Sequence, residues 1–379
     1  MLPLLTLGLL VFQLDRMNIA SALTGGLKED IQINQSTVNV GNFLMFLGII
    51  ILEIPSNIIL IRVGPRLFLP AQILIFGLIA TLQVLVRNRA GFLTTRLILG
   101  ICESGYIPGS LYVLSTWYKE AELARRVSIF FCGMFGGFAL SPVLAAGILR
   151  LHEANGLSGW QWIFLIEGIF TMFVSFIILF LLPGSPKKPK SLFKYSLITF
   201  SDRDKFILQE RLKADGRTES VPITLKFVFK TMAYWKRWPH FLATALVFGT
   251  WSPITTYTPS IFVSLGFNRI AASALTAVGG GLTLVVVNMF GWISDATGRR
   301  GFSVAIPIFV YLITLIILRE VQPHAGRWGK FGLWTLVNAF AVGYHPVQNA
   351  WLQLNCRSLE ERSISISYVE RESRTVTNI

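Results

Sequence analysis

The dominant pattern along the chain is a series of apolar runs of about twenty residues, separated by shorter polar stretches. An α-helix of about twenty residues crosses the ~30 Å hydrocarbon core of a bilayer. Glycine and proline recur inside the runs, as membrane helices tolerate, and the periodicity is helical rather than alternating. We therefore predict membrane helices over residues 2–22, 39–61, 67–86, 92–116, 126–149, 161–182, 239–262, 271–293, 301–318 and 331–354.

Polar segments divide these predicted helices into two groups. Six spans follow one another up to residue 182, and a Pro- and Gly-rich cluster then opens residues 183–237, which hold 13 of the 34 Lys and Arg residues. The spans resume over 238–356, and residues 357–379 form a polar tail. We expect an all-α membrane protein with an N-terminal six-helix bundle (1–182), a basic cytoplasmic linker (183–237) with an amphipathic helix at 202–215, and an incomplete C-terminal helical bundle (238–356).

Composition supports this class and excludes others. Hydrophobic residues make up 53% of the 379 residues and charged residues only 14%, against about 25% charged in soluble domains. The net charge of +14 is concentrated in loops on one side of the predicted membrane, which favours a cytoplasmic N-terminus rather than binding to nucleic acid. We expect a multi-pass protein of the plasma membrane. The chain has no zinc-ligand pattern, P-loop or dinucleotide fingerprint, so we expect no enzyme, cofactor or metal site.

One loop carries a recognisable motif. Residues 291–300 read GWISDATGRR, and the loop six spans earlier, residues 57–66, reads NIILIRVGPR. The first of these fits the inner-loop pattern G-x-x-x-D-x-x-G-R-R of the major facilitator superfamily at Gly291, Asp295, Gly298, Arg299 and Arg300. Physically, the pattern is a tight glycine turn with basic residues at the lipid headgroups and an acid able to bind them. The earlier loop has isoleucine in place of the acid.

Several stretches resemble the fungal allantoate-permease branch of the anion:cation symporter family within that superfamily. They include LDRMNI at 14–19, EIPSN at 53–57, RLILGICESG at 96–105, GWQWIF at 159–164 and GYHP at 343–346. The resemblance covers roughly residues 1–366 and implies proton-coupled uptake of carboxylates or similar anions. A full member would offer two further spans after residue 354, so the chain resembles a C-terminally truncated member.

The first and fourth predicted spans carry two charged residues each: Asp15 and Arg16, and Arg96 and Glu103. A charge at mid-membrane depth costs about 2.5–3.5 kcal/mol on insertion scales, so such residues are functional candidates. Arg96 and Glu103 are two helical turns apart and project from one face. The four charges sum to zero, and each arginine is expected to pair with an acid.

An arginine matches a carboxylate through two parallel hydrogen bonds. Protonation of Asp15 or Glu103 would release an arginine to bind an anion without changing the net charge. The family resemblance implies the same roles, with these two acids as proton carriers and Arg16 and Arg96 as substrate ligands. The alternative is a structural salt-bridge network between helices.

Further candidates for substrate binding lie in the second group of spans: Trp251, Tyr257, His345, Gln348 and Asn349. Glu53 and Glu167 are interpreted as structural, with Glu167 near the outer surface. Together these observations predict a monomeric secondary transporter that moves a small organic anion with protons. The alternative function is that of a truncated, non-transporting paralogue or nutrient-sensing membrane protein.

Overall fold

The computed structural model describes residues 1–184, 201–213, 233–235 and 238–355. Within these residues every regular element is a helix and no strand occurs. The N-terminal helices are α1 (Leu2–Thr24), α2 (Leu27–Asp30), α3 (Gln35–Val63), α4 (Pro65–Leu82), α5 (Arg89–Glu103), α6 (Tyr106–Trp117), α7 (Glu120–Ile148) and α8 (Gly159–Leu181). They are followed by α9 (Asp202–Lys213) and by α11 (Trp238–Ser264), α12 (Arg269–Thr297), α13 (Arg300–Val321), α14 (Arg327–Phe340) and α15 (His345–Leu354).

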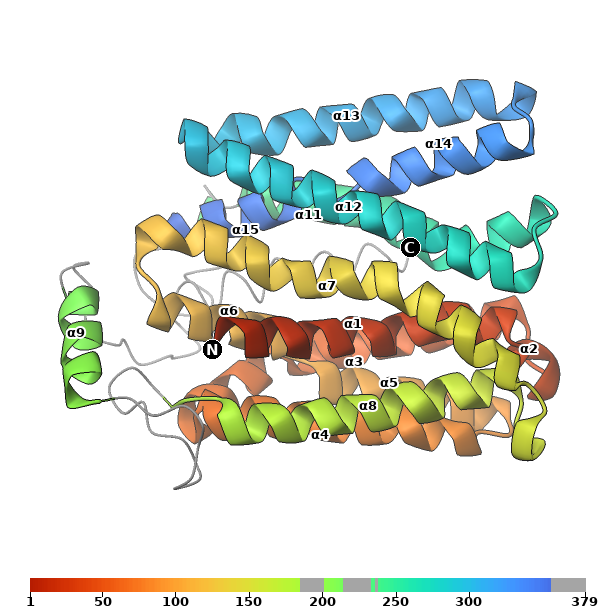
Figure 1. The fold of residues 1–379 in the computed structure, drawn as a ribbon, viewed down its shortest axis with the longest axis horizontal. Helices are drawn as coiled ribbons and strands as arrows, with labels where there is room; N and C mark the ends of the chain where they lie inside the picture. The colour runs from red at the N-terminus through yellow and green to blue at the C-terminus, as the bar shows by residue number, and fades with distance from the viewer. Residues whose placement is uncertain (185–200, 214–232, 236–237, 356–379) are drawn as a thin grey trace.

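The long helices lie side by side along the long axis of the molecule (Figure 1). α1 packs against α7 and α8, while α7 also runs along α12, so α7 joins the N-terminal helices to the C-terminal ones. Close approach of α1 and α7 depends on glycine, because a Cβ at Gly133 would lie 2.2 Å from the carbonyl oxygen of Thr6. α9 lies at one end of the molecule (Figure 1). It corresponds to the amphipathic helix predicted at residues 202–215.

The predicted all-helical membrane class is confirmed. Eight helical segments of the described chain are long and apolar enough to cross a membrane. The other two predicted spans correspond to α11, with 27 residues, and to α14 together with α15. The predicted linker and tail, at 183–237 and 357–379, lie largely outside the described residues.

Two predicted spans are not continuous helices. The span at 92–116 is broken between α5 and α6, at Ser104 and Gly105. The span at 331–354 is broken between α14 and α15, at residues 341–344. Hydropathy does not reveal either break because both sides of each break are apolar. The two spans are the fourth and the tenth, six apart, and interrupted helices at corresponding places in repeated halves point to a binding site.

Two glycine turns also lie six spans apart. Gly64 ends α3 with φ +93°, and Gly298 ends α12 with φ +65°. Positive φ favours glycine because other residues meet steric strain there. Both loops therefore end a helix at a glycine of positive φ, although ψ is 143° at Gly64 and 0° at Gly298.

Candidate functional site

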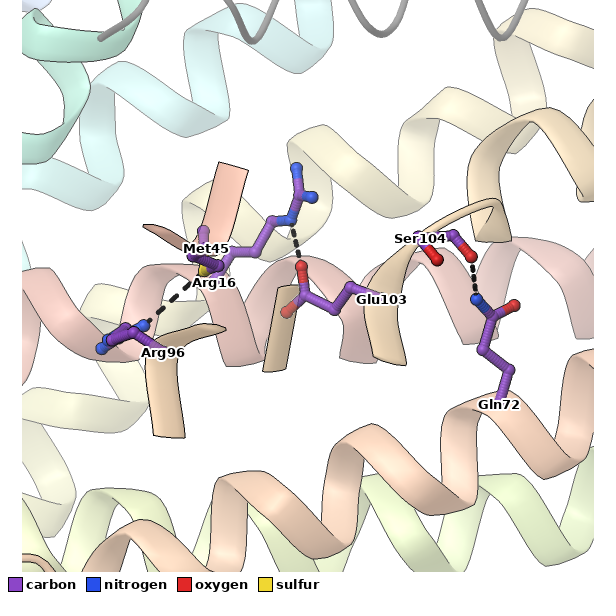
Figure 2. A network of polar contacts seen from close by, with 6 residues as sticks. All are labelled: Arg16, Met45, Gln72, Arg96, Glu103 and Ser104. Atoms are coloured by element: carbon purple, nitrogen blue, oxygen red, sulfur yellow. Dashed lines mark hydrogen bonds and ion pairs between the residues drawn. The ribbon is translucent and has the colours of Figure 1, made fainter. Parts of the chain in front are cut away.

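The centre of the candidate site is an ion pair between α1 and α5. Nε of Arg16 donates to Oε2 of Glu103 at 2.8 Å (Figure 2). The Glu103 side chain is fully buried, and that of Arg16 is 14% exposed. The guanidinium carbon of Arg16 also lies 4.3 Å from the centre of the Phe12 ring, on the same helix. The pair therefore sits inside the protein, where a charge-assisted hydrogen bond is weakly screened.

Arg96 has a different environment. Its side chain is fully buried, yet its only hydrogen-bond contact in the described chain is from Nη1 to the sulfur of Met45 at 3.8 Å. Its Nε and Nη2 atoms have no partner among the described residues, and its guanidinium carbon lies 5.5 Å from the centre of the Phe92 ring. The expectation that each arginine pairs with an acid is therefore wrong for Arg96, because Glu103 turns to α1 instead.

Asp15 contacts α8 and makes no ion pair with Arg16 or Arg96 among the described residues. Its Oδ1 accepts a hydrogen bond from Thr171 at 3.3 Å, and its Oδ2 has no hydrogen-bond partner among the described residues. Glu103 and Glu167 are both near enough to act on Asp15 electrostatically. Three carboxyl groups thus share one buried region, where like charges repel strongly.

Glu167 is a member of this group that sequence reasoning missed. It is 2% exposed, so its side chain is buried among the helices. When the Asn18 amide is oriented to satisfy its neighbours, its nitrogen donates to Oε2 of Glu167 at 2.5 Å. The sequence did offer a signal, because Glu167 lies in a strongly apolar span. Placing an acid there costs free energy, so it is expected to have a function or a partner.

The break between α5 and α6 fixes the backbone immediately after Glu103. The Ser104 carbonyl lacks a helical partner and accepts hydrogen bonds from Ser56 Oγ at 2.7 Å and from the Gln72 amide (Figure 2). Gly105 follows with φ +82°, and a Cβ there would lie 2.5 Å from Ser56 Oγ. α3 and α4 therefore hold the break that ends the helix of Arg96 and Glu103.

The polar residues of α15 are buried but bind other helices. Gln348 Nε2 donates to the His240 carbonyl and to Thr244 Oγ1, both at 2.7 Å, which ties α15 to α11. The Asn349 amide lies 3.1 Å from Nε2 of His345, and the His345 ring lies 4.9 Å from the Phe131 ring of α7. These residues hold the broken tenth span against α7 and α11.

Trp251 and Tyr257 both belong to α11 but differ in burial and in the helices they contact. Trp251 is buried, with its ring 4.9 Å from that of Phe138 on α7. The Tyr257 hydroxyl lies at the protein surface, where it donates to Asn39 Oδ1 at 2.6 Å and accepts from Gln35 Nε2 at 3.2 Å. Tyr257 thus connects α11 to the start of α3 rather than joining the buried charges.

The motif loop links α12 to α7. Gly291 is buried, and a Cβ at this position would lie 2.9 Å from Ser128 Oγ of α7. Asp295 lies close enough to Arg300 and to Arg125 of α7 for electrostatic interaction. Gly298 forms the turn and the exposed Arg299 precedes α13. The motif therefore contributes to the contact between the N-terminal and C-terminal helices.

Comparison with known proteins places this arrangement in a family. The chain matches the model of the Major Facilitator Superfamily over residues 5–369. It belongs to the major facilitator superfamily. Among relatives in this superfamily, the MFS-type transporter cnsO of Penicillium expansum is 30% identical over 97% of this chain and 71% of that protein.

Two other relatives are also transporters by name. A protein of Agrobacterium vitis named "Putative tartrate transporter" is 28% identical over 90% of this chain and 76% of its own length. An uncharacterized transporter of Saccharomyces cerevisiae is 26% identical over 92% of this chain, which spans only 65% of that protein. The superfamily and these relatives are transporters, not enzymes.

Solved structures agree on the fold. The xylose transporter XylE from E. coli, in a partially occluded inward-open conformation, superposes with a TM-score of 0.73 at 15% identity, covering 100% of this chain and 90% of XylE. A bacterial homologue of the human lysosomal transporter Spinster, inward-facing and occupied, gives a TM-score of 0.70 at 14% identity, with 100% and 78% coverage.

Proposed function

We propose that this member of the major facilitator superfamily moves a small organic anion across the membrane together with protons. Arg96 is the observation that carries the proposal. A buried guanidinium without an acceptor of its own is costly, and an anion is the group that would satisfy its remaining donors. The planar fork of arginine suits a carboxylate in particular.

The Arg16–Glu103 ion pair supplies a means of coupling. While Glu103 is ionised, it occupies Arg16. A proton on Glu103 would remove its charge and release Arg16 to join Arg96 in holding the anion. One proton and one monovalent anion then enter together, and the net charge of the buried region is unchanged. Asp15, which shares this region with Glu167, is the second proposed proton carrier.

Residues of the C-terminal helices are proposed to complete the site. Trp251, His345, Gln348 and Asn349 are buried in α11 and α15. We further propose that the helices of residues 1–182 and those of 238–356 move relative to each other about the site, joined by the linker at 183–237. The motif loop at Gly291, Asp295, Gly298, Arg299 and Arg300, which contacts α7, would influence that movement. We also propose that the protein is a monomer in the plasma membrane and that its N-terminus is cytoplasmic.

The same observations and the names of the relatives support a proposal for the substrate class. The planar fork of Arg16 and of Arg96 suits a carboxylate, the family resemblance is to carboxylate carriers, and one relative is named "Putative tartrate transporter". We therefore propose a small carboxylate, vitamin or allantoate-like anion as substrate. The bilayer is the other partner, and nucleic acid is not one.

The test is uptake of a panel of radiolabelled small carboxylates by cells that produce the chain, with and without a proton uncoupler. The neutral amide of each acid is the matched control. We expect at least one acid to accumulate, its amide to be excluded and the uncoupler to abolish accumulation. Equal uptake of an acid and its amide, or accumulation that persists with the uncoupler, would contradict the proposal.

A further inference from the structure

Glu167 is the only charged residue of α8. Its side chain is buried, and it forms no ion pair among the described residues. Removing a carboxylate from water without a partner of opposite charge is costly. The coupling proposed above uses Asp15 and Glu103 and gives Glu167 no part, although all three acids lie in one buried region.

Two hydrogen bonds join α1 to α8 around Glu167. The Asn18 amide nitrogen, in the orientation that satisfies its neighbours, donates to Oε2 of Glu167 at 2.5 Å. The Thr171 hydroxyl donates to Oδ1 of Asp15 at 3.3 Å. Asp15 and Asn18 are about one turn apart on α1, as are Glu167 and Thr171 on α8. Asp15 and Glu167, here called the acid pair, are therefore separated by about one turn, or about 5 Å, along the helices.

The donors next to the acid pair are already in use. The Asn18 nitrogen also donates to the Leu14 carbonyl at 2.9 Å, which takes its second hydrogen. The Thr171 hydroxyl has one hydrogen, and Asp15 accepts it. Oδ2 of Asp15 and Oε1 of Glu167 have no hydrogen-bond partner among the described residues. Each acid thus has one buried oxygen that a bound proton would satisfy.

The elements packed against α8 bring no cation to Glu167 besides Arg16, which α5 holds in an ion pair. Arg66 is the only ionisable residue of α4 and begins that helix, whereas Glu167 lies beside its end. The turn after α4 has no ionisable residue. Arg150, between α7 and α8, is exposed, and the ionisable residues of α7 all fall within 120–126, at the opposite end from that loop.

The charges in the interior of α1, α5 and α8 do not balance. Arg16 and Arg96 supply two positive charges, and arginine keeps its charge in proteins. Asp15, Glu103 and Glu167 supply three negative charges when all are ionised. Glu103 and Glu167 both act on Asp15 electrostatically. An uncompensated charge in a buried group is costly, and one retained proton removes it.

An apolar cluster separates the acid pair from the end of the molecule that carries α2. Ile19 and Leu23 of α1 belong to it, together with Trp160 and Phe164 of α8. Along both helices these residues lie between the acid pair and that end, where Trp160 also meets the turn at the end of α1. A proton bound to the pair is therefore closed off from solvent on this side.

We infer that Asp15 and Glu167 share a single proton in the resting protein and act as one proton-binding site. Like charges at such a separation oppose each other's ionisation, so a coupled pair of carboxyl groups can bind one proton between them. Glu103 does not hold this proton, because its carboxylate is bound to Arg16. The inference rests on the proposed function in one respect, since it makes the acid pair, rather than Asp15 alone, the second proton carrier.

Infrared spectroscopy of the whole chain, reconstituted in lipid at neutral pH without substrate, tests the inference. The C=O stretching band of a protonated carboxyl group is separate from the bands of a carboxylate, so the spectrum reports a retained proton directly. We expect the parent chain to show such a band. Its absence would overturn the inference, and this first measurement requires no variant to fold.

Two substitutions assign the band. Asp15→Asn and Glu167→Gln each leave two acids and two arginines, a balanced set, so the remaining member of the acid pair should ionise. We expect each variant, and the double variant, to lose the intensity of one carboxyl group. Loss in only one single variant would assign the proton to one acid. Twice the loss in the double variant would indicate two protons. Either result overturns the sharing.

Thr171→Val is the matched control, because it removes the hydrogen bond to Asp15 and keeps both acids. It should retain the band, as should Glu153→Gln, which removes an exposed acid from the loop before α8. Loss of the band in either control would overturn its assignment to the acid pair. Melting curves identify the folded variants, and either single substitution in the pair can overturn the inference by keeping the band.

The infrared measurement separates this inference from the proposed function, because it uses no substrate. If uptake is proton-coupled but the band is absent or survives in both single variants, the proposed function stands and the shared proton fails. If the band is lost in both variants while uptake by the parent chain is insensitive to the uncoupler, the shared proton stands and proton coupling fails.

Discussion

Arg16 and Glu103 are 87 residues apart in the chain, and their side chains meet at 2.8 Å between Nε and Oε2. Arg96 lies on the same helix as Glu103, two turns earlier, and makes no comparable bond within the described chain. The two arginines of the proposed site therefore differ in state. Arg16 forms an ion pair with Glu103, whereas Nε and Nη2 of Arg96 have no hydrogen-bond partner among the described residues.

This difference predicts unequal effects on stability when each arginine is replaced. Arg16→Met leaves the buried Glu103 carboxylate without its partner, which costs about 3–5 kcal/mol in other proteins. Arg96→Met removes a buried guanidinium that hydrogen-bonds no acid among the described residues, so it should cost much less or stabilise the fold. Melting temperatures of the two variants in detergent provide the measurement. An equal or larger loss for Arg96→Met would mean that Arg96 is part of the scaffold.

Gly105 provides a prediction about the break in the fourth span. Alanine there must adopt φ +82° and would press on Ser56 Oγ, so Gly105→Ala should lower the free energy of unfolding by about 1–3 kcal/mol. Gly147 near the end of α7 is the matched control, because a Cβ there meets nothing within 4 Å. Gly147→Ala should stabilise the helix by about 0.5–1 kcal/mol. Thermal melting compares them, and equal melting temperatures would show that the break tolerates a side chain.

The orientation in the membrane can be tested at two ends of the molecule. Asn34 precedes α3 beside α2, and Ser201 precedes α9 at the opposite end (Figure 1). With Cys102, Cys132 and Cys356 replaced by serine, Asn34→Cys should react with an impermeant thiol reagent on intact cells. Ser201→Cys should react only after the cells are opened. The reverse pattern would place the N-terminus outside the cell. It would also contradict the inference that the basic residues of 183–237 lie on the cytoplasmic side.

The sequence predicts much of the fold because membrane helices are encoded by length and hydropathy. It also gives Asp15, Arg16, Arg96 and Glu103 as candidate site residues, since charges in apolar spans are rare. Their pairing depends on how α1 and α5 are rotated and on the break after Ser104, which long-range contacts from Ser56 and Gln72 stabilise. The position of Glu167 in an apolar span was visible in the sequence, but its contacts with Asn18 and Asp15 were not, because a polar residue in an apolar run does not reveal which helix it faces.

The central claim is that Glu103 couples proton movement to anion transport. Glu103→Gln keeps the size of the side chain and imitates the protonated acid, so Arg16 is released at every pH. In proteoliposomes, we predict that the variant still exchanges labelled anion across the membrane but no longer accumulates it when a pH gradient is imposed. The parent chain should do both. Accumulation by Glu103→Gln that follows the pH gradient as in the parent would contradict the account.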